Sequence, residues 1–565
     1  MVWQLSITIM FLEPMTKPRL IYLPFGGAGE IGMNMYVYGY GPQDREQFIV
    51  VDTGVLFPDM ETAPGVDLII PDFSWLVERK SRVEAIFITH GHLDHLGAIS
   101  FVTGELDVPV YAREFSRQIA LDRIDEYGGN QSRFHTVDIY PDKITAGPFE
   151  VSYVPISHSI PESSSLIIDT PDGRIIHTGD FKLDHEPVIG EPFEEELWEE
   201  ICSEKILALI CDSTNALTPG KARSEASIGT NLDQLIQECE GMVIATTFAS
   251  HIARIYQIAQ AAELCGRNVV LLGRAMNRLV SHAIDVGILE DLPNQVSIEQ
   301  ARNLPRNSLL VLATGSQGEG RAATAQLSTG GSFKGLRVKR GDTVIYSSKT
   351  IPGNEVAISK IQNRFAELGV NIIDESSGLY HVSGHPNKTD LENLHKLVLP
   401  NLVIPMHGEY RHLKMHAEIA IDAGFNAIVA PNGSMVELLR GKLLDSEKEQ
   451  IGRLCIDGND IVGFKSDTIR ERLRMAHNGL VSIFLSRKSG RFNREGIIVQ
   501  CSGLNSDAFE EFQKELISMI LTKLSQSTKQ QLAHESKLKD ILGKATRKLC
   551  LDFYNKKPVI QIAIR

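Results

Sequence analysis

The most constraining feature of the sequence is the segment THGHLDHLGA at residues 89–98, which follows a short apolar run. The run EAIFIT has the composition of a β-strand, so the first histidine of the segment stands at the end of that strand. Side chains two residues apart in an extended backbone point the same way. The spacing therefore predicts a strand-to-helix junction with ligands for two metal ions: His90 and His92 for one, Asp94 and His95 for the other.

Short β-strands separated by turn residues dominate the first 200 residues. Runs such as RLIYLPF (19–25), QFIVVDTG (47–54) and SSLIIDT (164–170) are bounded by Gly, Pro or Asp. Few helical patterns interrupt them, and the clearest covers residues 114–128. This region is expected to form two layers of sheet with helices outside.

The pattern changes between residues 211 and 371, where strands alternate with helices. The apolar run GMVIATTF (241–248) precedes a helical pattern at 249–266. Such alternation is typical of a parallel α/β sheet. After residue 372 short strands are expected again, at 378–385, 401–409 and 425–433. A charged stretch at 440–452 then precedes a small α+β unit.

Composition excludes several classes of protein. The 565 residues are 43% hydrophobic and 23% charged, which is ordinary for a soluble globular protein. The net charge of −14 argues against a protein that coats nucleic acid through bulk positive charge. Seven cysteines without a CxxC spacing favour a reducing, cytoplasmic setting. No apolar run is long enough for a membrane helix, and residues 1–14 lack the pattern of a secretory signal and are expected to lie outside the fold.

The HxHxDH pattern resembles the metallo-β-lactamase superfamily, whose remaining motifs follow in order. VDTG, SHSIPES and IIHTGDFK supply, respectively, Asp52, His158 and Asp180. A carboxylate can bridge two cations with its two oxygens, which an imidazole cannot do. The resemblance implies that Asp52 is a supporting acid, that metal one is held by His90, His92, His158 and Asp180, and that metal two is held by Asp94, His95 and Asp180. His177, in the same motif as Asp180, is expected to be structural.

About 160 residues of α/β pattern precede the later histidines, and this resembles the β-CASP subgroup of nucleases. The subgroup's motifs match Asp212 in CDSTNA, His381 and His385 in HVSGHP, and His407 in IPMHGEY. The resemblance implies that His407 completes metal site two. The run from about 20 to 440 is more closely similar to the bacterial ribonuclease J family, since eleven strings occur in that family's order: GGAGEIGMN, GVDLIIPDFSWL, THGHLDH, HSIPES, HTGDFK, CDSTNA, TTFAS, TGSQGE, IPGNE, HVSGH and HGEYRHL.

This resemblance implies an α/β fold in which a metallo-β-lactamase αββα sandwich carries an inserted β-CASP α/β domain and a small C-terminal α+β domain. The expected segments are the first part of the core at 15–210, the β-CASP domain at 211–371, the completion of the core at 372–445, a linker at 446–470 and the C-terminal domain at 471–565.

The resemblance also implies a metal-dependent ribonuclease, a 5′-to-3′ exonuclease with endonuclease capacity that acts in RNA maturation and decay. Two zinc ions per subunit, replaceable by Mn²⁺ or Mg²⁺, would activate water and neutralise the phosphoryl oxygens. The expected catalytic residues are Asp94, His385 and Asp212. The expected substrate-binding residues are His381, Val382, Ser383, Gly384, His385, Ser316 and Ser250, with the 381–385 loop holding the 5′ phosphate.

Other function classes are weighed against this one. A β-CASP DNA-processing nuclease is the main alternative, which parallel RNA and DNA degradation assays would separate. A small-ester hydrolase does not need the long insert, and a scaffold protein does not need every ligand position filled. Residues 211–371 carry 16 Lys and Arg against 14 Asp and Glu, a net +2 that supports a local groove. The expected partners are RNA with a 5′-monophosphate end and further copies of the chain in a homodimer or homotetramer, without a membrane.

Overall fold

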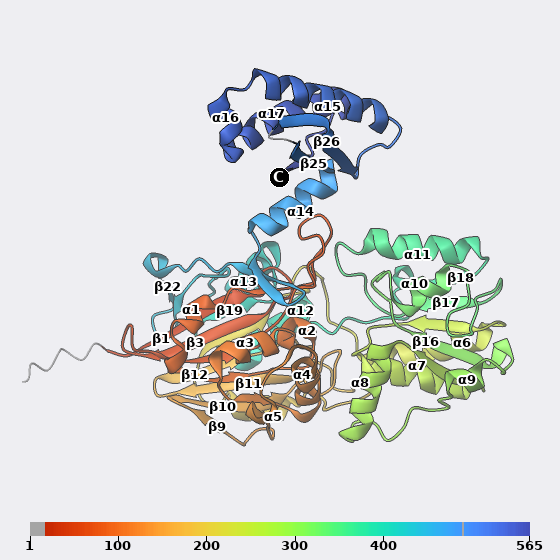
Figure 1. The fold of residues 1–565 in the computed structure, drawn as a ribbon. Helices are drawn as coiled ribbons and strands as arrows, with labels where there is room; N and C mark the ends of the chain where they lie inside the picture. Colours follow the sequence, from red (N-terminus) through yellow and green to blue (C-terminus); the bar gives the residue numbers. More distant parts are fainter. Residues whose placement is uncertain (1–16, 489–490) are drawn as a thin grey trace, which may run out of the picture. The chain divides into compact units, whose positions relative to one another are not determined.

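The computed structural model describes residues 17–488 and 491–565, so residues 1–14 lie outside the described range. The chain divides into two compact units (Figure 1). The first unit contains Ile70–Ile451 together with the described residues before Phe57. The second contains Phe57–Ile69 and Gly452–Arg565.

Two β-sheets form the centre of the first unit. An eight-stranded sheet has the order β22-β21-β1-β3-β4-β6-β7-β8, and a six-stranded sheet has the order β19-β13-β12-β11-β10-β9. The strands of the first are β1 (Arg19–Gly26), β3 (Met35–Gly41), β4 (Gln47–Val51), β6 (Val83–Phe87), β7 (Val110–Ala112), β8 (Phe134–Thr136), β21 (Val436–Glu437) and β22 (Lys442–Leu443). Those of the second are β9 (Ile144–Ala146), β10 (Phe149–Pro155), β11 (Ser164–Thr170), β12 (Gly173–His177), β13 (Ile206–Asp212) and β19 (Val403–Met406).

Side chains along these strands alternate between the two faces of each sheet, and those that point inward form the core between the sheets. Tyr22 and Phe87 of the larger sheet pack in one cluster with Tyr153 and Ile168 of the smaller sheet, and all four are fully buried. Neighbouring residues on the smaller sheet point outward, where Trp198 of α5 and Leu391 of α12 cover them. The helices of this layered core are α1 (Ser74–Val77), α2 (Leu93–Leu96), α3 (Ile99–Leu106), α4 (Glu114–Tyr127), α5 (Glu195–Ile201), α12 (Lys388–Val398) and α13 (Tyr410–Asp422). The predicted αββα sandwich is therefore confirmed.

A separate five-stranded parallel sheet, of order β15-β16-β14-β17-β18, occupies the middle of the chain. Its strands are β14 (Val243–Thr246), β15 (Asn268–Leu272), β16 (Leu309–Ala313), β17 (Thr343–Tyr346) and β18 (Asn371–Ile373). Its helices are α6 (Gly229–Glu238), α7 (Ile252–Leu264), α8 (Arg274–Asp285), α9 (Ile298–Ala301), α10 (Ala323–Ser328) and α11 (Glu355–Glu367). Helices α10 and α11 lie on one side of the sheet and α6 and α7 on the other (Figure 1), as expected from the strand-helix alternation.

Two predicted strands are wrong. Residues 378–385 form a loop, because side chains and not a strand ladder hold their backbone. Arg223 donates to the carbonyl oxygens of Gly378 and His381, and Ser347 donates to that of Tyr380. Residues 425–433 contain only an isolated bridge between Ala427 and Val403.

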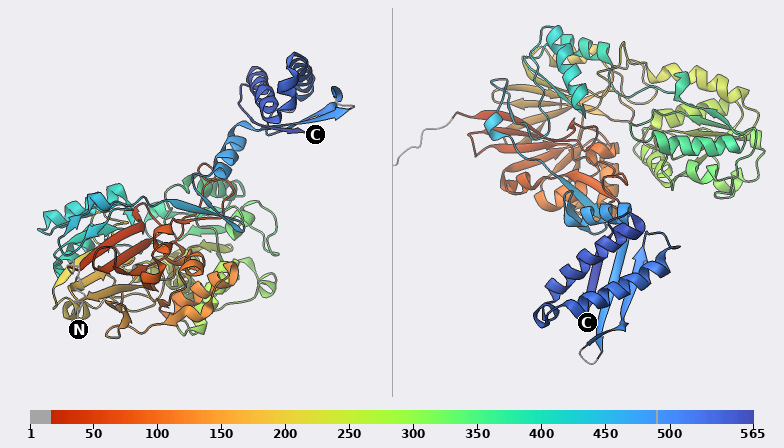
Figure 2. Two further views of the ribbon diagram at one scale, coloured as in Figure 1. Left: turned by 60° about the vertical axis from the view of Figure 1, so that its left-hand side comes forward. Right: turned by 90° about the horizontal axis from the view of Figure 1, so that it is seen from above.

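The second unit contains two small sheets. Strands β25 (Leu480–Lys488), β26 (Arg491–Ser502) and β27 (Val559–Ile564) form one, with the order β26-β25-β27. The other contains β23 (Arg453–Asp457), β24 (Asp460–Gly463) and β5 (Leu68–Pro71), of which Leu68 and Ile69 belong to this unit. The helices are α14 (Asp467–Asn478), α15 (Phe509–Gln526), α16 (Lys529–Ala533) and α17 (Glu535–Tyr554). Helices α15 and α17 cover one face of the first sheet (Figure 2), where Phe512 and Leu538 pack on Ile483. Strands β23 and β24 lie within the range predicted as a linker.

Candidate active site

The candidate ligands lie just beyond the ends of strands in both sheets of the core. His90 and His92 follow β6, His158 follows β10 and Asp180 follows β12. His407 follows β19, and β20 (Gly408–Glu409) pairs beside it with β2 (Ala28–Gly29). Residues separated by up to 317 positions are thus brought to one edge of the sandwich.

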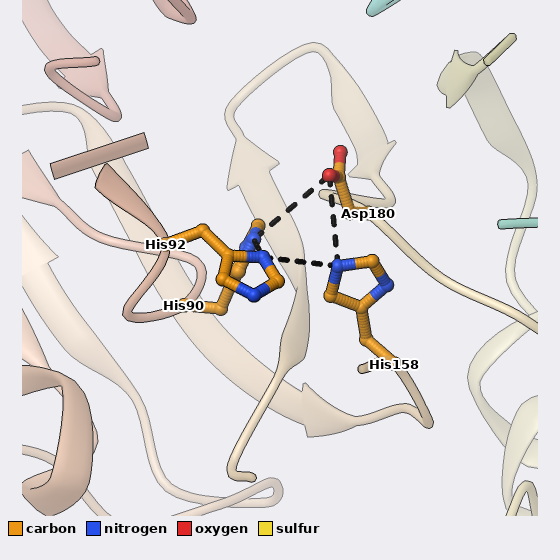
Figure 3. Close-up of side chains that lie close together, drawn as sticks. All are labelled: His90, His92, His158 and Asp180. Carbon is orange, nitrogen blue, oxygen red and sulfur yellow. Dashed lines mark hydrogen bonds and ion pairs between the residues drawn. The ribbon is translucent and has the colours of Figure 1, made fainter. Parts of the chain in front are cut away.

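The first group of ligands contains His90, His92, His158 and Asp180, whose ligand atoms all lie within 4.8 Å of one another (Figure 3). His92 Nδ1 is 3.1 Å from His90 Nε2 and 3.2 Å from His158 Nε2. Asp180 Oδ2 is 3.9 Å from His90 Nε2 and 3.8 Å from His158 Nε2. Three imidazole nitrogens that converge beside a carboxylate match the ligand set of a tetrahedral metal ion.

The outer nitrogens of these rings are held by other segments. His158 Nδ1 donates to the carbonyl oxygen of Gly384 over 2.7 Å, so its Nε2 carries the lone pair that faces the group. His92 Nε2 is 3.1 Å from Ser250 Oγ. The predicted substrate-binding residue Ser250 therefore contacts a candidate ligand.

The second group contains Asp94, His95, Asp180 and His407. His95 Nε2 is 3.2 Å from Asp180 Oδ2 and 3.8 Å from Asp94 Oδ2. His407 Nε2 is 3.5 Å from Asp94 Oδ2, and His407 Nδ1 is 2.8 Å from Asp180 Oδ1. Asp180 lies in both groups, in the position of a bridging carboxylate.

Asp52 supports the second group from behind. Its Oδ2 is 2.7 Å from His95 Nδ1, and its carboxylate also accepts hydrogen bonds from Thr89 N and Thr89 Oγ1. Asp52 is fully buried and has a φ of 62°, a strained conformation for a residue other than glycine. Gly54 of the same VDTG motif passes so close that a Cβ there would lie 1.7 Å from the Asp94 carbonyl oxygen.

Burial dominates the charge state of the first group. It lowers the pKa of His90 and of His158 well below the usual range, and it lowers the pKa of His92 to about 4. These three imidazoles are therefore neutral at physiological pH. Neutral imidazole is the form of histidine that coordinates a metal ion.

Carboxylates dominate the charge state of the second group. Burial lowers the pKa of His95, but Asp180, Asp52 and Asp94 outweigh it and raise that pKa well above the usual range. For His407, burial is likewise outweighed, mainly by Asp180, and the pKa rises to about 10. Nearby positive charge stabilises these buried carboxylates. A metal ion would supply that charge and would displace the imidazole protons.

The residues present fit a divalent metal. His407 Nε2 is buried and has no hydrogen-bond partner, and Asp94 Oδ2 lies 3.5 Å from it, so the nitrogen is costly to bury unless an ion satisfies it. The donors are imidazole nitrogens and carboxylate oxygens, a set that zinc, manganese and other divalent ions accept.

His385 and Asp212 lie beside these groups. His385 Nδ1 is 2.7 Å from Asp212 Oδ2 and 3.9 Å from Asp180 Oδ2. Asp212 is fully buried, whereas His385 is one-fifth exposed. The pair therefore presents an oriented imidazole at the edge of the candidate metal centre.

The other residues of the 381–385 loop line or support a cavity of about 330 Å³. His381, Val382 and Ser383 line it, while Gly384 lies against His158. Sequence reasoning missed the remaining lining residues: Asn215, Thr218, Lys221, Ala222, Arg223, Lys349 and Asn387. The lining thus carries three cationic side chains and no carboxylate.

The remaining predicted residues lie elsewhere. Ser316 is buried and is not among the residues that line the cavity. His177 is fully buried and its Nδ1 is 2.9 Å from Tyr38 Oη. It lies outside both candidate ligand groups.

Four family models match successive parts of the chain. They are described as the metallo-beta-lactamase superfamily (residues 29–227), the ribonuclease J beta-CASP domain (240–365), a Zn-dependent metallo-hydrolase RNA specificity domain (379–431) and the ribonuclease J C-terminal domain (467–565).

Curated relatives match over most of their length. A protein named Ribonuclease J from Sinorhizobium meliloti is 38% identical over 97% of each chain. The chain belongs to the ribonuclease J family. Ribonuclease J from Thermus thermophilus is 36% identical over 82% of this chain and 81% of the relative. Ribonuclease J 1 from Streptococcus pyogenes is 34% identical over 81% of each.

Membership of the ribonuclease J family confirms the prediction that the chain is a metal-dependent ribonuclease, a hydrolase that binds RNA and a divalent metal. It does not favour the alternative of a DNA-processing nuclease. A crystal structure of a protein of unknown function from Enterococcus faecalis shares the fold, with a TM-score of 0.51 and 18% identity over 74% of this chain and 99% of that chain. None of the helices in the described residues is long and apolar enough to span a membrane.

Proposed function

We propose that this ribonuclease J family member removes nucleotides from the 5′ end of RNA that carries a terminal monophosphate, and that it also cuts internally. The observation that carries the proposal is the cavity beside the 381–385 loop. Lys221, Arg223 and Lys349 line it without any carboxylate, so it suits a doubly charged phosphate.

One loop serves both the cavity and the reaction. Ser383 lines the cavity, and its hydroxyl accepts a hydrogen bond from Asn215. His385, two residues further, is held by Asp212 at the candidate metal centre. A 5′ phosphate bound at Ser383 would therefore set the position of the phosphodiester bond relative to His385.

The metal ligands of the proposal are His90, His92, His158 and Asp180 at one site, and Asp94, His95, Asp180 and His407 at the other. Zinc is the proposed ion because imidazoles dominate the set, with manganese or magnesium as functional replacements. When bound, the ions lower the pKa of water and neutralise charge on the phosphoryl oxygens.

The side chains supply orientation and proton transfer. The Asp94 side chain is 32% exposed against 2% for Asp180, so Asp94 is the carboxylate that an attacking water can reach. Water attacks phosphorus and the bond to the 3′ oxygen breaks. His385, oriented through Nδ1 by Asp212, then protonates that oxygen through its other nitrogen. The shortened RNA keeps a 5′ phosphate and is ready for the next cycle.

We further propose self-association and a cytoplasmic location. Phe484 and Ile498 face each other across β25 and β26 and are 44% and 56% exposed, an apolar pair suited to a second copy of the chain. All seven cysteines are free, which suits a reducing compartment and supports cytoplasmic RNA maturation and decay as the setting.

The test compares one RNA with a 5′-monophosphate, with a 5′-triphosphate and as a closed circle, next to DNA of the same sequence. We expect mononucleotide release from the monophosphorylated RNA, much slower release from the triphosphate, and slow internal cleavage of the circle. Equal mononucleotide release from both linear RNAs would contradict the end-sensing proposal.

A further inference from the structure

A third cluster of ligand-type side chains lies in the core of the sandwich, on the helix side of β13. Cys211 of β13 packs in the same apolar cluster as residues of α5, α12 and α13. The imidazoles of His395, from α12, and His416, from α13, meet the thiol there. All three side chains are fully buried, and their ligand atoms lie within 4.8 Å of one another.

Hydrogen bonding does not satisfy this cluster. His395 Nε2 is 3.0 Å from His416 Nε2, and His416 Nδ1 is 2.8 Å from Ser213 Oγ. His395 Nδ1 is buried and has no partner. His395 Nδ1 stays without a partner in either tautomer. When both rings carry their proton on Nδ1, the two Nε2 lone pairs face each other across 3.0 Å, which is unfavourable unless a cation lies between them.

We propose that Cys211, His395 and His416 bind a structural zinc ion, separate from the catalytic metals. Thiolate and imidazole are the donors of structural zinc sites. Two nitrogens that each lie about 2.0–2.1 Å from one tetrahedral zinc ion are roughly 3.3 Å apart, close to the 3.0 Å between the imidazoles here. On binding, the Cys211 proton leaves to solvent and the proton between the rings moves to Nδ1 of its own imidazole, so that two coordinate bonds replace the hydrogen bond between the Nε2 atoms. Three side chains leave one of the four tetrahedral positions of the ion for a further ligand.

The position of the cluster explains what such an ion does. Helix α12 follows the 381–385 loop, and α13 follows His407. Cys211 directly precedes Asp212, which orients His385. An ion at the cluster therefore ties both helices to β13 and stabilises the segments that carry catalytic side chains, without touching the RNA.

Cobalt substitution tests this inference through a signal that the catalytic centre cannot produce. Among the described residues, both catalytic ligand groups contain only nitrogen and oxygen donors. Cobalt in those groups gives weak visible absorption, whereas cobalt bound to a thiolate adds an intense charge-transfer band in the near ultraviolet. The full chain is produced with cobalt in place of zinc, and its absorption spectrum and cobalt content are measured.

Three variants accompany the wild-type chain. Cys211→Ser is nearly isosteric, and His395→Phe keeps a ring in the core. Cys455→Ser removes another fully buried thiol, which belongs to none of the candidate ligand groups in the described part of the chain. We expect the charge-transfer band in the wild type and in Cys455→Ser. Cys211→Ser should lose the band, and both Cys211→Ser and His395→Phe should lose about one cobalt equivalent.

Two results would overturn the inference. One is a wild-type spectrum without the thiolate band although the visible absorption shows cobalt in the catalytic centre. The other is a band that persists in Cys211→Ser. The wild-type spectrum decides the question even if a variant fails to fold, and neither result depends on RNA cleavage.

Discussion

At the scale of single residues, the candidate site contains unusual backbone conformations and buried charged groups. Asp52 and His407 have φ values of 62° and 47°, backbone conformations that residues other than glycine rarely adopt. Buried carboxylates lie beside buried imidazoles, as at Asp180 and His95, where Oδ2 and Nε2 are 3.2 Å apart. Such strain and charge persist only where the surrounding structure holds them, and they are common at catalytic sites.

Removing a ligand should stop the reaction and leave the fold intact. We predict that His92→Ala or Asp94→Ala lowers RNA cleavage by more than the roughly 10- to 100-fold typical of losing an outer-shell partner. Cleavage assays, metal analysis and thermal melting measure this, with Glu78→Ala, whose side chain is 74% exposed, as the control. Near wild-type turnover at full metal occupancy would refute the ligand assignment.

Ser383 should matter for end recognition alone. We predict that Ser383→Ala removes a hydrogen bond to a charged phosphate, worth about 1.5–3 kcal/mol, or roughly 10- to 150-fold in binding. The loss should fall on exonucleolytic decay of monophosphorylated RNA and spare a circular RNA. His385→Ala should damage both activities, and the exposed Ser227→Ala neither. If Ser383→Ala reduced exonucleolytic decay and cleavage of the circular RNA equally, the loop would contact RNA generally and would not recognise its 5′ end.

At the scale of elements, one buried arginine joins α7 to the 381–385 loop. Arg254 is fully buried and pairs with Glu225 through Nε and Nη2, at 2.6 and 2.8 Å. Its Nη1 donates to Ser347 O and lies 3.1 Å from His381 Nδ1. A helix of the β-CASP domain thus positions the loop that serves the cavity.

Breaking this pair should destabilise the first unit. We predict that Arg254→Met leaves Glu225 without its guanidinium partner and costs about 3–5 kcal/mol of unfolding free energy, and that adding Glu225→Gln restores part of this. Denaturant unfolding measures both variants. If Arg254→Met were as stable as the wild type, Arg254 would not anchor the 381–385 loop.

The same pair predicts a pH dependence. Burial raises the pKa of Glu225, but Arg254 and His251 outweigh it and hold that pKa well below the usual range. The stabilisation is therefore complete above the ordinary glutamate pKa of about 4.3 and is lost as pH falls through the lower folded value. The difference in unfolding free energy between wild type and the double variant Arg254→Met with Glu225→Gln, which has no carboxyl group at position 225, should stay constant from neutral pH down to that point. A difference that shrinks near neutral pH would contradict this assignment.

At the scale of the whole molecule, the second unit is built from two separate stretches of chain. Asp67 N donates to Ile456 O of β23, and Gly458 N, just after β23, donates to Asp67 Oδ2, so hydrogen bonds join Phe57–Ile69 to the later stretch. A truncation that respects this pairing removes residues 467–565 and keeps β23 and β24.

We predict that this truncation leaves a folded, RNA-cleaving protein with fewer copies of the chain in each particle. Exposed apolar residues of the C-terminal sheet are the proposed contact between copies. Phe484→Asp with Ile498→Asp should lower the mass in the same way without unfolding the domain, because neither side chain belongs to its core. Light scattering measures the mass, which is divided by the mass of one chain to give the number of copies. The same number of copies as in the wild type for both proteins would contradict the proposed self-association.

The sequence by itself determined the strand-to-helix motifs and the chemistry that each can perform. The spacing within THGHLDH orders its side chains because an extended backbone alternates direction and a helix then begins at Leu93. Only the tertiary structure decided which distant segments meet. Ser250 contacts His92 across 158 residues, His385 contacts Asp212 across 173, and the thiol of Cys211 meets two histidines that no local pattern connects. Such contacts depend on the order of strands in the sheets and on the packing of helices against them, which local spacing does not specify.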